Sequence, residues 1–405
     1  MKKFNKFLSV AVASAMVMAM AGCSNTDNGS AATGTNAATE SAAASDSAAS
    51  GSVFKIGGIG PTTGGAAVYG LAVQHGAEIA VEEINAAGGI NGYQVEFKFQ
   101  DDEADAEKSV NAYNALKDWG AQIIDGSTTS GACIAVTDKT KEDNMFQITP
   151  SGSAVECVQY DNNFRVCFSN PNQGLASAQY IGENGLAEKI AVIYDSSDVY
   201  SSGIYEKFAK EAENQPFEIV AAEAFTADNK TDFSVQLQKA KDAGADMVFL
   251  PIYYQESALI LTQAAAMGYA PKWFSCDGMD GILGGVDNFD VSLTEGVMLL
   301  TPFAADATDD LTQSFVTKYK EKYGDTPNQF AADSYDAIYV IKAAIEKSGV
   351  TPDMSVSDIC DGMKAAMTEI TVDGLTGNGM TWTADGEANK APKAVVIENG
   401  AYKAM

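Results

Sequence analysis

Strand and helix patterns alternate in two successive sets along this chain, and this alternation restricts the possible folds more than any other feature. A short apolar run, VFKIGGIG, begins at Val53, and apolar residues then recur at spacings of three and four up to Ile84. The cycle repeats as far as MFQIT, restarts after NNFRVCFSN and continues to KWFS. Strands that alternate with single helices form parallel sheets through right-handed crossovers. We therefore predict an α/β protein with two lobes, each built on a doubly wound parallel sheet.

The last quarter of the chain is expected to return to the first lobe before it completes the second. The run GVMLLTPF predicts a buried strand, two helix patterns follow it, and the β-rich C-terminal part predicts an edge hairpin. The expected bounds are 53–170 plus 303–376 for lobe 1 and 171–302 plus 377–405 for lobe 2. Three crossover strands are expected to join the lobes, at about 168–173, 299–304 and 374–381.

The N-terminus has the pattern of an export signal. Three lysines precede an apolar stretch that is too short for a membrane span, which predicts a signal peptide over residues 1–22. The stretch ends in Met-Ala-Gly-Cys, which resembles a bacterial lipobox with Cys23 as the lipidated residue. The alternative is an ordinary signal peptide with an incidental cysteine. Residues 23–52 lack apolar periodicity and predict a flexible linker, so we expect an extracytoplasmic protein that is lipid-anchored to the bacterial cell membrane.

Composition and motifs argue against several function classes. The formal net charge is −28 at pH 7, and phosphate contacts need lysine and arginine, so we expect no nucleic-acid partner. His75 is the one histidine, and the motifs of nucleophilic serines, P-loops and zinc proteases do not occur. GIGPTTGG misses the dinucleotide-binding spacing because Thr63 stands at the third glycine position. We therefore expect a non-enzymatic protein with no metal and no cofactor.

Small polar residues gather where the strands of the first lobe are expected to end. Ligands of open α/β sheets bind at these carboxyl ends. Ser151 and Ser153 follow the strand MFQIT directly, and Ser130 and Gly131 precede a helix pattern. The free N–H groups and the positive dipole end of a helix attract anions, so this edge is suited to a carboxylate.

The expected strand ends of the second lobe carry an acid and aromatic rings. Asp277 follows an apolar strand, and in a cleft such a carboxylate would pair with an ammonium group. Tyr200 and Tyr253, together with Tyr69 from the first lobe, would supply flat walls with hydroxyl tips. A carboxylate site opposite an ammonium site predicts an amino-acid ligand.

From Val53 to the C-terminus the chain resembles the leucine/isoleucine/valine-binding proteins, the branched-chain amino-acid branch of the periplasmic-binding-protein-like (type I, Venus-flytrap) components of ABC transporters. The stretches that carry the resemblance are IGGIGPTTGGAAVYGLAVQHGAEIAVEEINAAGGINGYQVEFKFQDDEAD, ITPSGSA, TDFSVQLQKAKDAGADMVFLPIYYQESALILTQA and FAADSYDAIYVIKAAI. The resemblance implies two lobes that are joined by three strands and close on an amino acid. It implies that Ser130 and the loop 151–153 hold the α-carboxylate and part of the ammonium group. It also implies that Asp277 and Tyr253 complete the ammonium site, and that Tyr69 and Tyr200 shape the pocket.

Two departures from the family pattern limit this transfer. Many relatives carry a disulfide that joins the segments around Ala104 and Thr129, and neither position is cysteine here. The ammonium-binding acid is often glutamate, whereas this chain has the shorter Asp277. Leucine specificity therefore does not follow, and polar amino acids or small amides such as urea remain open.

The first hypothesis is a binding protein that captures a small amino acid, aliphatic or branched-chain, and delivers it to an ABC permease. The alternative is a sensory component that reports the ligand to a membrane receptor. We expect a monomer. The export signal also permits disulfides, and the turn residues Asp161-Asn162-Asn163 could bring Cys157 and Cys167 together. Two buried free thiols are the alternative for this pair.

Overall fold

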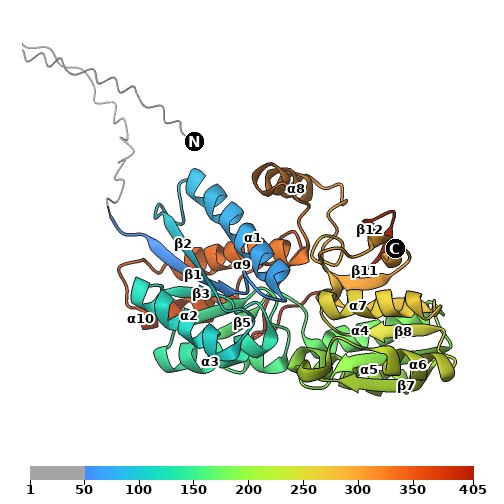
Figure 1. The fold of residues 1–405 in the computed structure, drawn as a ribbon. Coiled ribbons are helices and arrows are strands. Elements are labelled where there is room, and N and C mark those ends of the chain that lie inside the picture. The colour runs from blue at the N-terminus through green and yellow to red at the C-terminus, as the bar shows by residue number, and fades with distance from the viewer. Residues whose placement is uncertain (1–50) are drawn as a thin grey trace, which may run out of the picture. The chain divides into compact units, whose positions relative to one another are not determined.

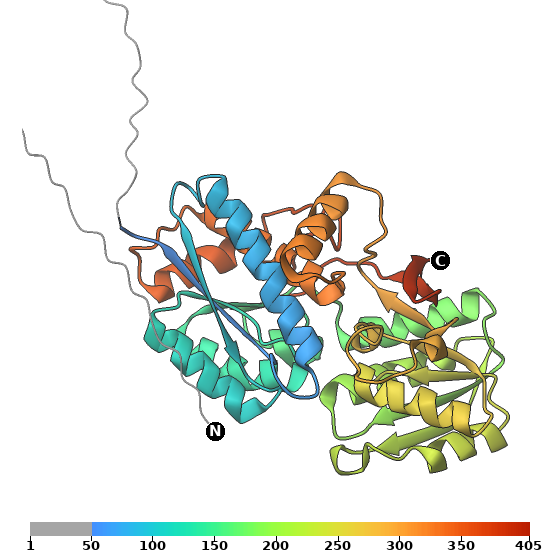
Figure 2. The ribbon, with the colours of Figure 1, turned by 45° about the horizontal axis from the view of Figure 1, so that its top comes forward.

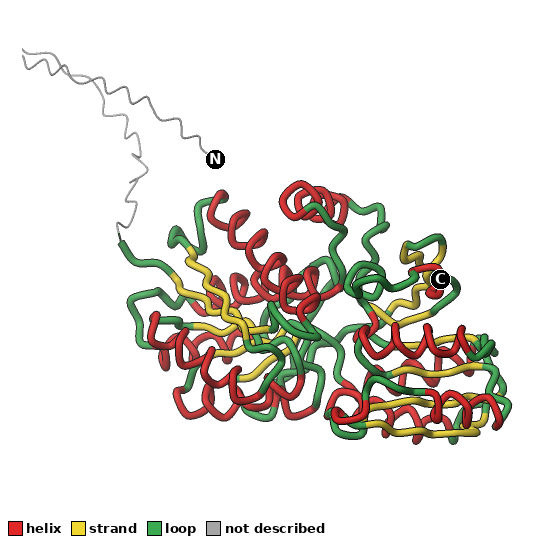
Figure 3. Tube along the Cα trace, viewed as in Figure 1, coloured by secondary structure: helices red, strands yellow, loops and turns green. Residues whose placement is uncertain are grey.

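Two separate sheets form two α/β lobes, as the alternating patterns predict. The structure is a computed structural model that describes residues 51–405, so the predicted signal peptide 1–22, the lipidation site Cys23 and most of the linker 23–52 lie outside the described residues. Figure 3 shows the two groups of strands, each flanked by helices. Within residues 51–405, no helix combines the length and the apolar character that a membrane span requires.

Lobe 1 is built on a five-stranded parallel sheet with the order β2-β1-β3-β4-β5. Its first elements follow one another as strand and helix along the chain. They are β1 (Phe54–Gly60), α1 (Ala67–Ala86), β2 (Val95–Asp101), α2 (Ala106–Trp119), β3 (Ile123–Asp125), α3 (Ser130–Asp143), β4 (Phe146–Thr149), the 3-10 helix η1 (Val155–Val158) and β5 (Asn163–Arg165).

Lobe 2 is built on a seven-stranded sheet with the order β12-β11-β10-β9-β8-β6-β7, in which the pairs β10–β11 and β11–β12 are antiparallel and the others are parallel. The C-terminal pair confirms the predicted edge hairpin. The elements are α4 (Asn170–Glu183), β6 (Lys189–Asp195), α5 (Val199–Ala212), β7 (Glu218–Phe225), η2 (Ala227–Asn229), α6 (Ser234–Asp242), β8 (Met247–Leu250), α7 (Tyr254–Ala266), β9 (Lys272–Ser275), η3 (Asp277–Met279), η4 (Val291–Thr294), β10 (Met298–Thr301), β11 (Lys393–Glu398) and β12 (Ala401–Ala404).

The chain returns to lobe 1 after β10 with the helices α8 (Asp310–Tyr323), α9 (Gln329–Ser348) and α10 (Val356–Met367). Figures 1 and 2 show α9 beside α1, although the two helices lie far apart in the sequence. Their approach depends on Gly76, because a Cβ atom there would lie 2.0 Å from the carbonyl oxygen of Ala331. The core of lobe 1 thus includes an early and a late helix of the chain.

The predicted crossover strands are wrong over two of their three ranges. Residues 168–173 include the start of α4, whose N-cap Ser169 accepts a hydrogen bond from the backbone N–H of Asn172 at 3.4 Å. Residues 374–381 contain no strand and contribute only to an isolated bridge between Val372 and Met380. The middle range overlaps β10, which belongs to the lobe 2 sheet. A segment that leaves one sheet for another has no neighbouring strand with which to pair, so these connections are irregular.

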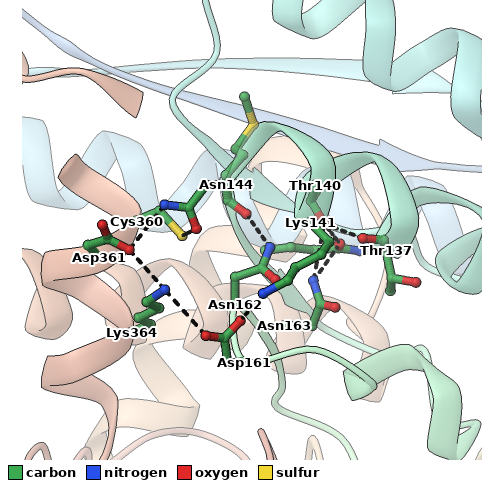
Figure 4. A network of polar contacts seen from close by, with 12 residues as sticks. Thr137, Thr140, Lys141, Asn144, Asp161, Asn162, Asn163, Cys360, Asp361 and Lys364 are labelled. Atoms are coloured by element: carbon green, nitrogen blue, oxygen red, sulfur yellow. Dashed lines mark hydrogen bonds and ion pairs between the residues drawn. The ribbon is translucent and has the colours of Figure 1, made fainter. Parts of the chain in front are cut away.

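Helix α10 is not predicted by the sequence patterns, and a polar network holds it against α3 and the turn before β5 (Figure 4). The side-chain amide of Asn144 donates hydrogen bonds to Ser357 Oγ at 2.8 Å and to Asp361 Oδ1 at 3.0 Å. Lys364 forms an ion pair with Asp361 at 2.8 Å and another with Asp161 at 3.3 Å. The network therefore links α10 to the end of α3 and to the turn before β5.

Candidate functional site

The predicted strand ends of both lobes meet around one small cavity of about 20 Å³. Six of the seven predicted ligand-binding residues line it, and Thr128, Thr129, Gly278 and Phe330 join them. The six are Tyr69, Ser130, Ser151, Tyr200, Tyr253 and Asp277. Ser153 is buried behind this lining, where its backbone N–H donates to Ser130 Oγ at 3.1 Å.

The lobe 1 side of the cavity is formed by the N-terminus of α3. Its N-cap residue Thr129 makes no capping hydrogen bond, and within the described chain the buried Thr129 hydroxyl has no partner. The Ser130 hydroxyl oxygen accepts the N–H groups of Ser153 and Ala154, both at 3.1 Å. The Ser151 hydroxyl donates to the carbonyl oxygen of Thr128 at 2.6 Å. The serines therefore fix the loop, and the helix N–H groups with the Thr129 hydroxyl are the donors left for an anion.

Arg165 holds the same loop from behind and was not recognised from the sequence. Its side chain is fully buried, and its guanidinium donates to the carbonyl oxygens of Gly152 at 3.2 Å and Ala154 at 2.8 Å. It also forms an ion pair with Glu387 at 3.3 Å. Arg165 is the only arginine of the chain, and this is the signal that could have identified it.

Asp277 forms the acidic side of the cavity and is almost fully buried. Tyr200 donates its hydroxyl to Asp277 Oδ1 at 2.6 Å, and the side-chain amide of Gln173 donates to Oδ2 at 2.8 Å. Burial raises the pKa of Asp277 to about 7, although these two hydrogen bonds act in the opposite direction. A cation that enters the cavity would stabilise the charged carboxylate. Gln173 lies on α4, and no sequence pattern links it with Asp277, which is 104 residues further along the chain.

Aromatic rings enclose the space between these two sides. The rings of Tyr200 and Tyr253 stack with centroids 5.0 Å apart, and Tyr69 meets Tyr253 edge-on at 5.5 Å. Phe330 of α9 lies 4.5 Å from the Tyr69 ring, a contact that the sequence patterns did not predict. The Tyr69 hydroxyl connects the lobes, because it donates to the carbonyl oxygen of Gly278 and accepts the backbone N–H of Tyr254 at 3.1 Å. Burial raises the pKa of Tyr69, so this hydroxyl stays neutral.

A wider cleft of about 390 Å³ adjoins the small cavity and shares Thr129, Tyr200 and Tyr253 with it. Both lobes contribute to its lining. Its polar residues include Asp198 and the ion pair of Lys230 with Glu256, whose atoms lie 3.0 Å apart. The space next to the small cavity is therefore partly polar.

The structure does not show the predicted bridge between Cys157 and Cys167, and all five cysteines of the described chain are free thiols in it. The predicted turn does form, since the backbone N–H of Asn163 donates to the carbonyl oxygen of Tyr160 at 3.0 Å. However, η1 directs Cys157 toward α3, where its thiol donates to the carbonyl oxygen of Ser130 at 3.7 Å. Cys167 lies two residues after β5, which pairs with β4.

The sequence is similar to periplasmic binding proteins over most of its length. A sequence model of the periplasmic binding protein family matches residues 53–401. The chain is 30% identical over 300 residues to the Leu/Ile/Val-binding protein homolog 3 of Brucella melitensis, covering 74% of this chain and 80% of that protein. It is also 30% identical over 302 residues to the leucine-, isoleucine-, valine-, threonine-, and alanine-binding protein of Pseudomonas aeruginosa, covering 73% and 78%.

Solved structures extend this similarity to the fold. The substrate-binding protein LivJ of Streptococcus pneumoniae, in complex with isoleucine, superposes with a TM-score of 0.78 at 28% identity, covering 87% of this chain and 99% of that one. A solute-binding protein of R. palustris in complex with benzoate has a TM-score of 0.76 at 20% identity, covering 87% and 95%. At 20% identity, the match to the R. palustris protein shows similarity of the fold alone.

Proposed function

We propose that this chain, which belongs to the leucine/isoleucine/valine-binding family of periplasmic binding proteins, captures a small aliphatic amino acid and delivers it to an ABC permease. Members of this family are extracytoplasmic solute-binding proteins of ABC transporters, not enzymes. The ligand of this chain, its anchor and its monomeric state are the parts that we propose.

The observation that carries the proposal is the pairing of opposite sites across one cavity. The N-terminus of α3 offers N–H donors on one side, and the buried carboxyl of Asp277 lies on the other. An α-amino acid carries a carboxylate and an ammonium group on the same carbon, so its two charges complement these two sites. Tyr69, Tyr200 and Tyr253 would contact the remaining apolar part of the ligand.

A polar amino acid is the second candidate, and the wider cleft favours it. A side chain that is too large for the small cavity would extend into the cleft beside Asp198 and Glu256. Carboxylates at that position would interact well with a hydroxyl or an amide, and poorly with a long aliphatic chain.

Export and lipidation at Cys23 complete the proposal. The basic and apolar residues before Cys23 support a lipobox, and a lipid anchor would keep the protein close to its permease. Growth with a labelled fatty acid tests this directly. We expect label on the wild-type protein and none on Cys23→Ser, whereas equal labelling of both would disprove lipidation at this residue.

A thermal-shift screen of the twenty amino acids, with urea and benzoate added, tests the ligand class. A ligand at one hundred times its dissociation constant stabilises a protein by about 2.7 kcal/mol. We expect aliphatic amino acids to raise the melting temperature of the wild-type protein and to have little effect on Asp277→Asn. A shift with benzoate or urea alone would overturn the amino-acid proposal.

A further inference from the structure

Two cysteine thiols lie side by side directly below the N-terminus of α3. Cys133 is in the first turn of α3 and Cys157 is in η1, and both side chains are fully buried. Together with Ala154 they form a small apolar cluster of their own. The helices that carry them, α3 and η1, are in direct contact.

The surroundings fix both sulfur atoms. The Gln147 side-chain amide donates to Cys133 Sγ at 3.6 Å, and Cys157 Sγ donates to the carbonyl oxygen of Ser130 at 3.7 Å. A Cβ atom on Gly152 would come within 3.0 Å of Cys133 Sγ, so Cys133 has no free space on that side. The two segments are already joined by the Ser130 hydroxyl, which accepts the N–H groups of Ser153 and Ala154. The backbone segments that carry these two sulfurs are therefore already in contact, which a disulfide requires.

The other thiols of the described chain have different neighbours. Cys276 lies 3.5 Å from the hydroxyl of Ser177, and Cys360 donates to Asn144 Oδ1 at 3.5 Å. Cys167 lies two residues beyond β5, outside the apolar cluster that holds Cys133 and Cys157. The geometry thus selects one pair from five cysteines.

We propose that Cys133 and Cys157 form a disulfide in the exported protein. The family is extracytoplasmic, and in that compartment disulfides form and persist. The reaction is thiol–disulfide exchange with a disulfide oxidant, either an oxidoreductase or a small disulfide such as oxidised glutathione.

In the first step the Cys133 thiolate attacks one sulfur of the oxidant, and the other sulfur leaves as a thiolate. The Cys157 thiolate then attacks Cys133 Sγ and releases the second oxidant sulfur. Two cysteine thiols lose two electrons and two protons, and the oxidant becomes two thiols. Because both sulfurs are buried in the folded protein, the exchange takes place while the chain folds.

The bridge would connect the first turn of α3 to the segment that follows the loop 151–154. These two segments hold the donors of the carboxylate site, so the bridge would keep them in place when the lobes move. It would also constrain the unfolded chain, which raises the melting temperature of the oxidised protein.

Tryptic peptide mapping under non-reducing conditions tests the proposal, because cleavage after Lys139, Lys141 and Arg165 places the three nearby cysteines in different peptides. The full exported chain is isolated from an oxidising compartment, or is refolded from the reduced state in glutathione buffer, and is then alkylated. We expect a peptide 118–139 linked to a peptide 142–165. Recovery of both peptides alkylated, or a link between 142–165 and 166–189, would overturn the proposal.

Melting temperatures provide a second measurement. Adding a thiol reductant should lower the melting temperature of the wild-type protein by several degrees. It should lower the melting temperature of the control variant Cys167→Ser by the same amount. The reductant should not change the melting temperature of Cys157→Ser, which lacks the bridge. An equal response of the two variants would count against the bridge, and the mapping of the wild-type protein decides the question if a variant fails to fold.

Discussion

The carboxyl group of Asp277 is surrounded by neutral donors, Tyr200 and Gln173, and within residues 51–405 it forms no ion pair with a lysine or arginine. We predict that Asp277→Asn weakens amino-acid binding by about 2–5 kcal/mol, because the ligand's ammonium group would lose its buried counter-ion. Ser153→Ala is the control, and a lost neutral hydrogen bond should cost it about 1 kcal/mol or less. Calorimetry on both variants decides, and equal losses would show that Asp277 does not hold the ammonium group.

The raised pKa of Asp277 also predicts a pH dependence of binding. In the ligand-free protein the group is half protonated near pH 7, and the ammonium group binds the charged form. Affinity should therefore be complete above pH 7 and should fall as the pH drops below it, by about tenfold per pH unit. Titrations between pH 5 and pH 8 measure this. Asp277→Asn should lose the dependence, and a wild-type affinity that is constant over this range would contradict the prediction.

Arg165 gives a prediction about stability. Arg165→Gln should lower the free energy of unfolding by about 3 kcal/mol or more, because the loop carbonyls and Glu387 would lose a fully buried partner. Lys139→Gln is the matched control, since its exposed pair with Glu142 contributes about 0.5 kcal/mol at most. Urea denaturation measures both, and similar values for the two variants would refute this role of Arg165.

Six of the seven predicted ligand-binding residues line one cavity, and the sequence could place them together because the strand ends of a doubly wound sheet converge by topology. The residues that contact and orient them could not be placed there from the sequence. Gln173 reaches Asp277 from α4, and Phe330 reaches Tyr69 from α9, so each contact depends on packing between distant elements. Ser153 was expected in the cavity, but the orientation of its loop is set by Ser130 and not by the strand that precedes it.

At the scale of elements, strands and helices with a clear period were predictable, and those that depend on tertiary contacts were not. Helix α10 has a glycine in its middle, Gly362, which weakens its helix pattern. That glycine is required by packing, since a Cβ there would lie 2.5 Å from Val350 Cγ1. The signal that remained was the N-cap Ser355, which accepts the backbone N–H of Asp358 at 3.1 Å.

The contact between α3 and α10 can be tested at Asn144, which ends α3 in the left-handed conformation with a φ of 45°. Asn144→Gly keeps this conformation but removes the hydrogen bonds to α10, whereas Asn144→Ala also introduces backbone strain. We expect both to destabilise the protein, with the alanine variant about 1 kcal/mol less stable than the glycine variant. Urea denaturation compares them. A glycine variant as stable as wild type would mean that the hydrogen bonds of Asn144 shown in Figure 4 contribute nothing to stability.

For the whole molecule, the small cavity has a consequence for ligand entry. Its volume of about 20 Å³ is enough for roughly one water molecule and too small for an amino acid. For the proposed ligand to enter this cavity, the lobes would have to separate, and the bonds of the Tyr69 hydroxyl to Gly278 and Tyr254 would have to break.

We predict that ligand shifts the population toward the closed arrangement and reduces the radius of gyration. Small-angle scattering with and without a ligand found in the thermal-shift screen measures the change. A non-binding amino acid serves as the control. An unchanged radius together with proven binding would rule out closure of the lobes.

The edge strands of the two sheets affect whether copies of the protein associate through their sheets at high local concentration. A bare strand edge offers unpaired N–H and C=O groups to other molecules and promotes aggregation. Here β5 has only three residues, and the N–H of Arg165 on that edge is taken by the carbonyl oxygen of Gly386. The edge strand β12 is also short, and its Lys403 pairs with Glu398 of the neighbouring strand at 2.9 Å. Many copies can therefore crowd together without adding strands to one another's sheets along these two edges.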